Sequence, residues 1–342
     1  MTDVILYMVT VLVWGSTWLV INFQLGEVAP EVSVVYRYAI AAVLLFAWCR
    51  VRGVQLSYGL KAHVRFMLLG LLLFGINYIA TYSAQAYIAS ALNAVVFSSM
   101  MWMNVLNTRL FFGTRIEPRV GVGALIGVAG LAILFWPGIV DVNLTNRTLI
   151  GAGLSLGGAL VASLGNMVSH RAQREGLPIV PSNAWGMFYG AIVTALIAWR
   201  RDLPFNFEYT ASYVASLLYL SIFGSIFAFG TYLKLLGRIG PAQAGYAVVM
   251  FPVVAVLLSV AFEGLVVDWH VLAGIALVIT GNLAILGGRR LVRGVRQWAR
   301  GVLAAFRLAR GPARFNGPST AGLVNRLFER KTLKQPACRE GG

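Results

Sequence analysis

Residues 66–108 read FMLLGLLLFGINYIATYSAQAYIASALNAVVFSSMMWMNVLNT and contain no Lys, Arg, Asp or Glu over 43 positions. A helix crosses the hydrocarbon core of a bilayer with about 20 apolar residues, so this run is long enough for two transmembrane helices. The whole chain has the same character, because 58% of its 342 residues are apolar and 12% are charged. In soluble domains, roughly 45–50% of the residues are apolar and about 25% are charged. The composition excludes a soluble globular protein.

Apolar runs of similar length recur along the chain and predict ten transmembrane helices in total. Beyond the 43-residue run, single helices are expected at 4–26, 32–49, 120–140, 148–169, 176–199, 209–233, 239–262 and 269–288. The run at 32–49 is interrupted only by Arg37. A cleaved signal peptide is not expected, because no basic residue precedes the first run.

Basic residues are distributed unequally between alternate loops. Eleven Lys and Arg fall in the loops on the N-terminal side of the membrane and three in the opposite loops, which predicts that both termini are cytoplasmic. The segment 289–342 adds 13 Lys and Arg and only two acids. Its first part has apolar residues every three or four positions, which is typical of an amphipathic helix on the anionic inner leaflet, and disorder is expected beyond Arg310. Nucleic acid is not an expected partner.

The sequence matches itself at an offset of 151 residues, and either an internal repeat or chance similarity between apolar segments explains the match. The matching pairs are Ile88 and Ile239, Val105 and Val256, Gly113 and Gly264, Gly123 and Gly274, and Gly130 and Gly281. Gly240-Pro241 breaks the second copy, which places a hidden turn at Ala89-Ser90 in the first. A repeat predicts two five-helix units at 1–140 and 141–288, followed by the basic tail. Five is odd, so the second unit would be inverted in the membrane.

The fold class expected from these observations is an all-α polytopic membrane protein with ten helices in two inverted five-helix repeats. Several short motifs also resemble the drug/metabolite transporter superfamily and, within it, the EamA-like family of bacterial inner-membrane transporters. These motifs are Trp14-Gly15-Ser16, Arg37, Phe251-Pro252, Phe262-Glu263-Gly264 and the stretch from Gly274 to Gly281-Asn282. The resemblance covers about residues 4–288 and implies two inverted halves that export amino acids or other small metabolites. One departure is Gly113-Thr114-Arg115, where the family often has an acidic residue.

Polar and aromatic side chains inside the spans are the candidates for a substrate site, because polar groups in hydrocarbon are costly and usually face a cavity or another helix. Helical spacing places Asn77 and Thr81 on one face and Asn93, Phe97 and Asn104 on another. The alternative is that each amide only bonds a neighbouring helix, which contributes about 0.6 kcal/mol. The candidate substrate-binding residues are Trp14, Arg37, Asn77, Tyr78, Tyr82, Asn93, Phe97, Asn104, Asn166, Trp185, Tyr189 and Tyr246.

Two charged residues have two interpretations each. Arg37 could bind a substrate carboxylate from inside a cavity, or its side chain could snorkel to the outer interface. Glu263, at the end of a span, could exchange a proton during transport if burial raised its pKa, or it could cap the helix end. The sequence does not choose between these interpretations.

The function that these expectations favour is secondary transport of a small metabolite, such as an amino acid or a similar amphiphilic solute, across the inner membrane by alternating access. Export is the direction that the resemblance implies. An importer of a vitamin-like metabolite and a channel or scaffold are the alternatives. An enzyme is not expected, because no paired carboxylates or metal-binding motif lie within the spans. No cofactor or metal site is expected, and the oligomeric state is not predicted.

Overall fold

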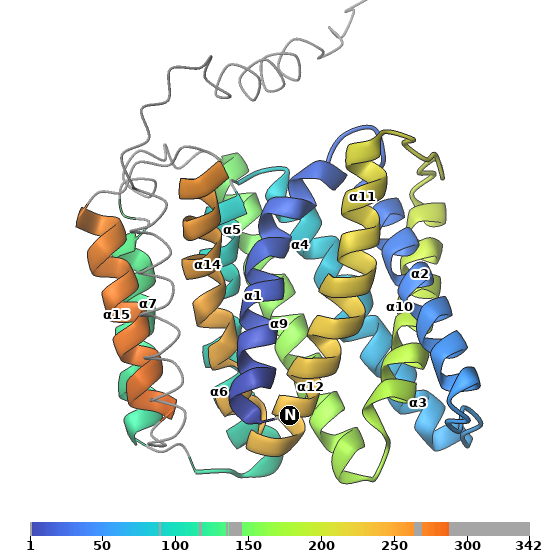
Figure 1. The fold of residues 1–342 in the computed structure, drawn as a ribbon, viewed down its shortest axis with the longest axis horizontal. Helices are drawn as coiled ribbons and strands as arrows, with labels where there is room; N and C mark the ends of the chain where they lie inside the picture. The colour runs from blue at the N-terminus through green and yellow to red at the C-terminus, as the bar shows by residue number, and fades with distance from the viewer. Residues whose placement is uncertain are drawn as a thin grey trace, which may run out of the picture.

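Helices form all the regular secondary structure in the part of the chain that the computed structural model describes, which is residues 2–88, 90–115, 118–134, 136, 146–262 and 269–286 (Figure 1). The first group of elements is α1 (Asp3–Ile21), the 3₁₀ turn η1 (Asn22–Gln24), α2 (Pro30–Val51), α3 (Leu60–Leu69), the π-helix η2 (Gly70–Ile76), α4 (Asn77–Gln85), α5 (Ser90–Phe97), α6 (Met100–Phe112) and α7 (Pro118–Leu134). The second is α9 (Asn146–Arg174), α10 (Ile179–Arg200), α11 (Ala211–Tyr219), the π-helix η3 (Leu220–Phe227), α12 (Ala228–Ile239), α13 (Pro241–Ala244), α14 (Tyr246–Phe262) and α15 (Trp269–Leu286).

Helices occupy the apolar runs of the sequence. Within the described ranges, six uninterrupted helical stretches are long and apolar enough to cross a membrane, and three apolar helices are shorter. The six are Asp3–Gln24, Pro30–Val51, Leu60–Gln85, Leu149–Arg174, Ile179–Arg200 and Ala211–Ile239. The chain is therefore a polytopic helical membrane protein. Glu263 and the basic tail at 289–342 lie outside the described residues.

The 43-residue uncharged run folds into more than one helix. Helix α4 ends at Gln85 and α5 begins at Ser90, so the chain turns in the region where the repeat placed a break. A second interruption, at Ser98-Ser99 between α5 and α6, has no counterpart in the sequence prediction. In the later segment, Gly240 has φ +85° and is followed by Pro241 at the start of α13. This left-handed backbone favours glycine, and proline suits the first position of a helix.

Helices α7 and α15 pack so closely that there is no room for a side chain at Gly130 or Gly281, where the two helices meet. A β-carbon on Gly281 would lie 2.5 Å from the carbonyl oxygen of Gly123, and one on Gly130 would lie 2.9 Å from the carbonyl oxygen of Gly274. Gly130 and Gly281 are 151 positions apart, as are Gly123 and Gly274. The two contacts are therefore the same contact with the partners exchanged. Small residues of this kind let membrane helices approach each other.

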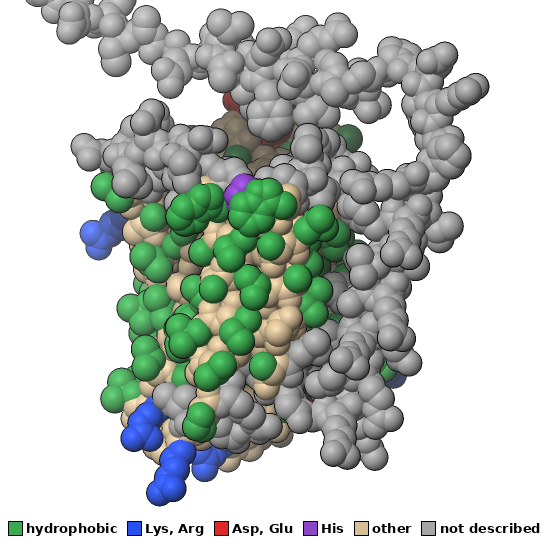
Figure 2. Space-filling model, turned by 90° about the vertical axis from the view of Figure 1, so that its left-hand side faces the viewer, with side chains coloured by type: hydrophobic (Ala, Val, Ile, Leu, Met, Phe, Trp, Pro, Cys, Tyr) green, Lys and Arg blue, Asp and Glu red, His purple; other side chains and the backbone are tan. Residues whose placement is uncertain are grey.

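The face formed by α7 and α15 is apolar on the outside (Figure 2). Val122, Leu125 and Leu272 are exposed there. Lys and Arg side chains lie mainly beyond the lower end of this apolar band in the view of Figure 2. An exposed apolar surface bounded by basic side chains suits hydrocarbon in the middle and lipid headgroups at the edge.

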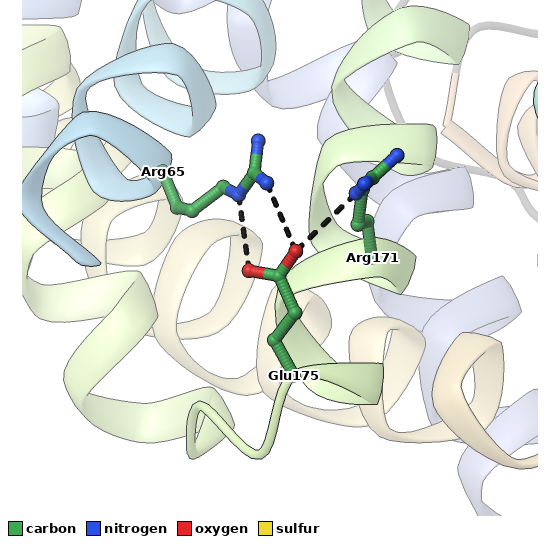
Figure 3. Close-up of polar contacts among 3 residues, drawn as sticks. All are labelled: Arg65, Arg171 and Glu175. Carbon is green, nitrogen blue, oxygen red and sulfur yellow. Dashed lines mark hydrogen bonds and ion pairs between the residues drawn. The ribbon is translucent and has the colours of Figure 1, made fainter. Parts of the chain in front are cut away.

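Ion pairs tie the helices together at both ends of the molecule. At the lower end in Figure 1, Arg65 of α3 donates to both carboxylate oxygens of Glu175, at 2.9 and 3.2 Å, and Arg171 of α9 donates to one of them at 3.3 Å (Figure 3). These hydrogen bonds, that of Arg65 above all, hold the pKa of Glu175 below its usual range. At the opposite end, Arg201 pairs with Glu31 of α2. The pairs of Glu175 with Arg65 and Arg171 are partly exposed and are therefore weak, at about 0–1 kcal/mol, whereas the Glu31 side chain is buried.

Candidate substrate cavity

A partly open cavity lies where helices from both parts of the chain meet. Its interior admits the centre of a water-sized sphere over about 50 Å³, which is room for about three or four water molecules. Typical pockets for small ligands measure roughly 300–1,000 Å³, so this cavity is contracted. The lining residues are Trp14, Thr17, Trp18, Ile21, Leu73, Asn77, Tyr78, Thr81, Phe97, Met100, Ala162, Asn166, Phe229, Tyr232 and Phe251. None of these is acidic or basic.

Trp14 of α1 is the centre of an aromatic wall. Its ring centroid lies 4.7 Å from that of Phe229 and 4.9 Å from that of Tyr232, both on α12, and 5.5 Å from that of Phe251 on α14. The indole N–H donates to the carbonyl oxygen of Gly224 at 3.0 Å. Gly224 lies in the π-helix η3, and π-helical turns occur frequently at functional sites. The wall can contact an apolar or aromatic part of a solute.

Asn166 of α9 supplies a polar group to the same cavity. Its Nδ2 donates to the Tyr232 hydroxyl at 2.9 Å and to Asn104 Oδ1 at 3.2 Å. Its Oδ1 has no hydrogen-bond partner among the described residues, although the side chain is fully buried. A buried polar atom without a partner is costly, so Asn166 has a spare acceptor for a solute donor.

Arg37 of α2 is buried directly behind the cavity wall. The side chain is 1% exposed, its Nε donates to Ser225 Oγ at 2.9 Å, and its Nη1 donates to the Tyr82 hydroxyl at 3.2 Å. The Cζ atom lies 4.6 Å from the centroid of the Tyr78 ring and 5.4 Å from that of Tyr38. The guanidinium group therefore faces neighbouring helices and does not snorkel to the interface.

The structure brings five of the sequence candidates together on the cavity surface: Trp14, Asn77, Tyr78, Phe97 and Asn166. Three others contact this surface from behind, because Arg37 and Tyr82 meet at Tyr78 and Asn104 accepts from Asn166. Two more are buried nearby. Asn93 donates to the backbone oxygen of Thr81 at 2.9 Å, and Tyr246 accepts through its backbone from the Tyr7 hydroxyl.

Trp185 and Tyr189 lie elsewhere, in an aromatic cluster between α10 and α3. The Tyr189 hydroxyl is 2.9 Å from Nδ1 of His63, and Trp185 donates to the backbone oxygen of Leu56 at 3.1 Å. Neither residue lines the cavity. Their side chains tie α10 to α3 and to the segment that precedes α3.

Several lining residues were not among the sequence candidates. Some had a usable signal: Trp18 lies one helical turn after Trp14, and Phe251 belongs to a motif quoted for the family resemblance. Phe229 and Tyr232 had none, because nothing local distinguishes them from the other aromatic residues of that span. The lining residues missed are Thr17, Trp18, Ile21, Leu73, Ala162, Phe229, Tyr232 and Phe251.

A bundle of apolar helices around a small aromatic and amide-lined cavity is an arrangement found in membrane transport proteins. Comparison with known proteins gives the family: the model of the EamA-like transporter family matches residues 1–136 and again 143–287. The chain is 30% identical to the uncharacterized inner membrane transporter YedA of Escherichia coli strain K12, over 74% of this chain and 80% of that protein. The chain therefore belongs to the EamA-like transporter family, within the drug/metabolite transporter superfamily, and is a multi-pass inner-membrane protein.

Two further comparisons agree with this assignment. The uncharacterized transporter YoaV of Bacillus subtilis strain 168 is 26% identical, over 75% of this chain and 87% of its own length. A crystal structure with 21% sequence identity superposes with a TM-score of 0.69 and covers 84% of this chain and 98% of that one. At this identity the structure supports the fold alone. The family and relatives are transporters, which is the general function they support here.

Proposed function

We propose that the chain is a secondary transporter built from two inverted five-helix halves, 1–140 and 141–288, with ten membrane crossings and both termini in the cytoplasm. Two separate family matches, one to each half, support this division. The glycine contacts between α7 and α15 also support it, because exchanging the halves reproduces them. Each half carries one π-helix in the same place, since η2 ends at Ile76 and η3 ends 151 positions later, at Phe227.

The transport mode in this proposal is alternating access. The observation that carries it is the position of the cavity, which is walled by helices of both halves. Inverted halves can exchange conformations and so open one central site to each side of the membrane in turn. The partly exposed Arg65–Glu175 pair at one end is weak enough to break and form again during such a change.

The proposed solute is a small amphiphile such as an amino acid, and the proposed direction is export. Aromatic rings around Trp14 suit the apolar part of the solute, and the amides of Asn77 and Asn166 suit its polar groups. An importer of a ring-containing, vitamin-like solute remains a second candidate within the same family. The chemistry of the cavity is compatible with both directions.

Countertransport in proteoliposomes tests this proposal. Vesicles containing the purified chain are preloaded with a pool of amino acids and metabolites, and the exchange of each labelled solute is followed with and without a pH gradient. We expect saturable exchange that protein-free vesicles lack. Flux that does not saturate would indicate a channel, and no exchange by folded, inserted protein would contradict a carrier for these solutes. The protein can be inserted into the vesicles in either of two orientations. Comparing the rates of solute movement for the two orientations separates export from import.

A further inference from the structure

Arg37 is a buried cation that has no ion-pair partner among the described residues. The acidic residues in that part of the chain lie at helix ends or in connecting segments, and the closest in sequence, Glu31, pairs with Arg201. Two hydroxyl groups and two aromatic faces surround the guanidinium instead. These neighbours lower the cost of burial but do not neutralise the charge. In membrane proteins, buried charges of this kind mark paths and sites of transported solutes.

One nitrogen of the guanidinium is still available. Nη2 of Arg37 has no hydrogen-bond partner in the described part of the chain. A β-carbon added to Gly224 would lie 3.1 Å from this nitrogen and 3.1 Å from Cγ2 of Thr17. Because Thr17 lines the cavity, Nη2 lies behind the cavity wall, beside a glycine whose missing side chain leaves room for it.

Tyr78 separates the guanidinium from the cavity. Its ring lines the cavity and also lies 4.6 Å from Cζ of Arg37. Movement of this one side chain would enlarge a cavity that is too small for a metabolite and would uncover Nη2 and Nη1 together. The guanidinium presents pairs of N–H groups whose spacing matches the two oxygens of a carboxylate.

We propose that Arg37 and the η3 segment around Gly224 form an anion subsite that binds a single carboxylate of the transported solute, so that the substrates are organic monocarboxylates with an apolar or aromatic body. This inference rests on the proposed carrier function. One cation accounts for one carboxylate. The described cavity lining contains no acidic residue to hold an organic cation, and the aromatic wall around Trp14 receives the body of the solute.

The experiment compares compounds that differ only in the head group. Binding of radiolabelled phenylacetate, hexanoate and 3-phenylpropionate to the purified protein in detergent is measured by equilibrium dialysis, each beside its uncharged amide. We expect at least one carboxylate to bind saturably and its amide to bind at least tenfold more weakly. Equal binding of carboxylates and amides, or no binding of any of the three carboxylates, would overturn the subsite.

Two variants and one control assign the effect to Arg37. Arg37→Gln should weaken carboxylate binding at least tenfold and remove the preference over the amide, whereas Arg50→Gln, an exposed cation on the same helix, should change neither. Gly224→Ala should weaken carboxylate binding by crowding Nη2. The melting temperature without ligand gives a separate readout: Arg37→Gln should leave it unchanged or raised, because an uncompensated buried charge is removed. A large fall, with unchanged binding, would identify Arg37 as merely structural.

The binding assay also tests the anion subsite independently of the proposed carrier function. If Arg37→Gln protein still exchanges a solute at the wild-type rate in proteoliposomes, the carrier stands and the anion subsite falls. If carboxylates bind with the expected preference but no solute exchanges, the subsite stands and the carrier falls.

Discussion

At the scale of single residues, the cavity shows how one amide can have both a structural and a functional contact. Asn166 bonds Tyr232 of α12 and Asn104 of α6, and it also presents an acceptor oxygen without a partner. Asn107 lies on α6, as Asn104 does. Its side chain donates to Ser163 of α9 at 2.9 Å, and it does not line the cavity. The two residues are therefore a matched pair for separating helix association from solute binding.

Asn166→Leu should reduce solute exchange at least tenfold while the protein stays folded. The loss of each of its hydrogen bonds should cost about 0.6 kcal/mol on average and at most about 1.7 kcal/mol. Asn107→Leu should cost a similar amount and leave exchange unchanged. Exchange rates in proteoliposomes and melting temperatures in detergent measure the two effects. Equal loss of exchange in both variants would show that Asn166 acts only in helix packing.

At the scale of helices, glycine determines how closely α7 and α15 approach. The backbone of Gly123 and Gly127 would lie 2.5 and 2.7 Å from a β-carbon on Gly281, and a backbone cannot rotate away as a side chain can. Gly121, on the same helix α7, has no atom within 4 Å of its β-carbon position. Neighbouring glycines of one helix thus have different roles, which their shared sequence motif does not reveal.

Gly281→Ala should separate α7 from α15 and destabilise the protein by about 1–3 kcal/mol, as overpacking usually does. Gly121→Ala should be neutral or stabilising by about 0.5–1 kcal/mol, because alanine loses less backbone entropy in a helix. The melting temperature and the monodisperse fraction after heating check both expectations. A Gly281→Ala protein as stable as the wild type would contradict the close contact.

At the scale of the whole molecule, orientation follows from charge. The start of α3, which contains Lys61, lies at the same end of the molecule as the N-terminus, whereas the start of α11 lies at the opposite end (Figure 1). The preference of Lys and Arg for the cytoplasmic side predicts which end faces inward. Leu60 and Tyr209 are 82% and 86% exposed and suit chemical labelling at the two ends.

Single cysteines at these positions should report the orientation. In a chain with Cys49 and Cys338 replaced by Ala, Tyr209→Cys should react with a membrane-impermeant maleimide added to intact cells, and Leu60→Cys should react only after permeabilisation. The reverse pattern would place both termini outside. Labelling of both cysteines from outside would contradict the odd number of crossings predicted between them.

Local patterns were enough to predict the membrane class, the helical segments and the family. A hydrophobic run of about 20 residues indicates a helix in the membrane, whatever the rest of the fold. The offset of 151 residues between matching segments is likewise visible in the sequence alone. The helical period also placed Asn77 and Thr81 on one face, and both line the cavity. The break at Ser98-Ser99 was not predicted, because neither serine is a strong helix breaker.

What the sequence alone determined is therefore where helices form, that they lie in a membrane, and which residues are too polar to face lipid. Only the tertiary structure decided which of these residues meet. Ser225 is 188 positions from the guanidinium it contacts, and Tyr232 is 66 positions from Asn166. The packing of helices at glycine contacts decides such pairings, and it equally places Trp185 and Tyr189 away from the cavity. Hydrophobicity and period are local properties, whereas the distance between two helices depends on every contact between them.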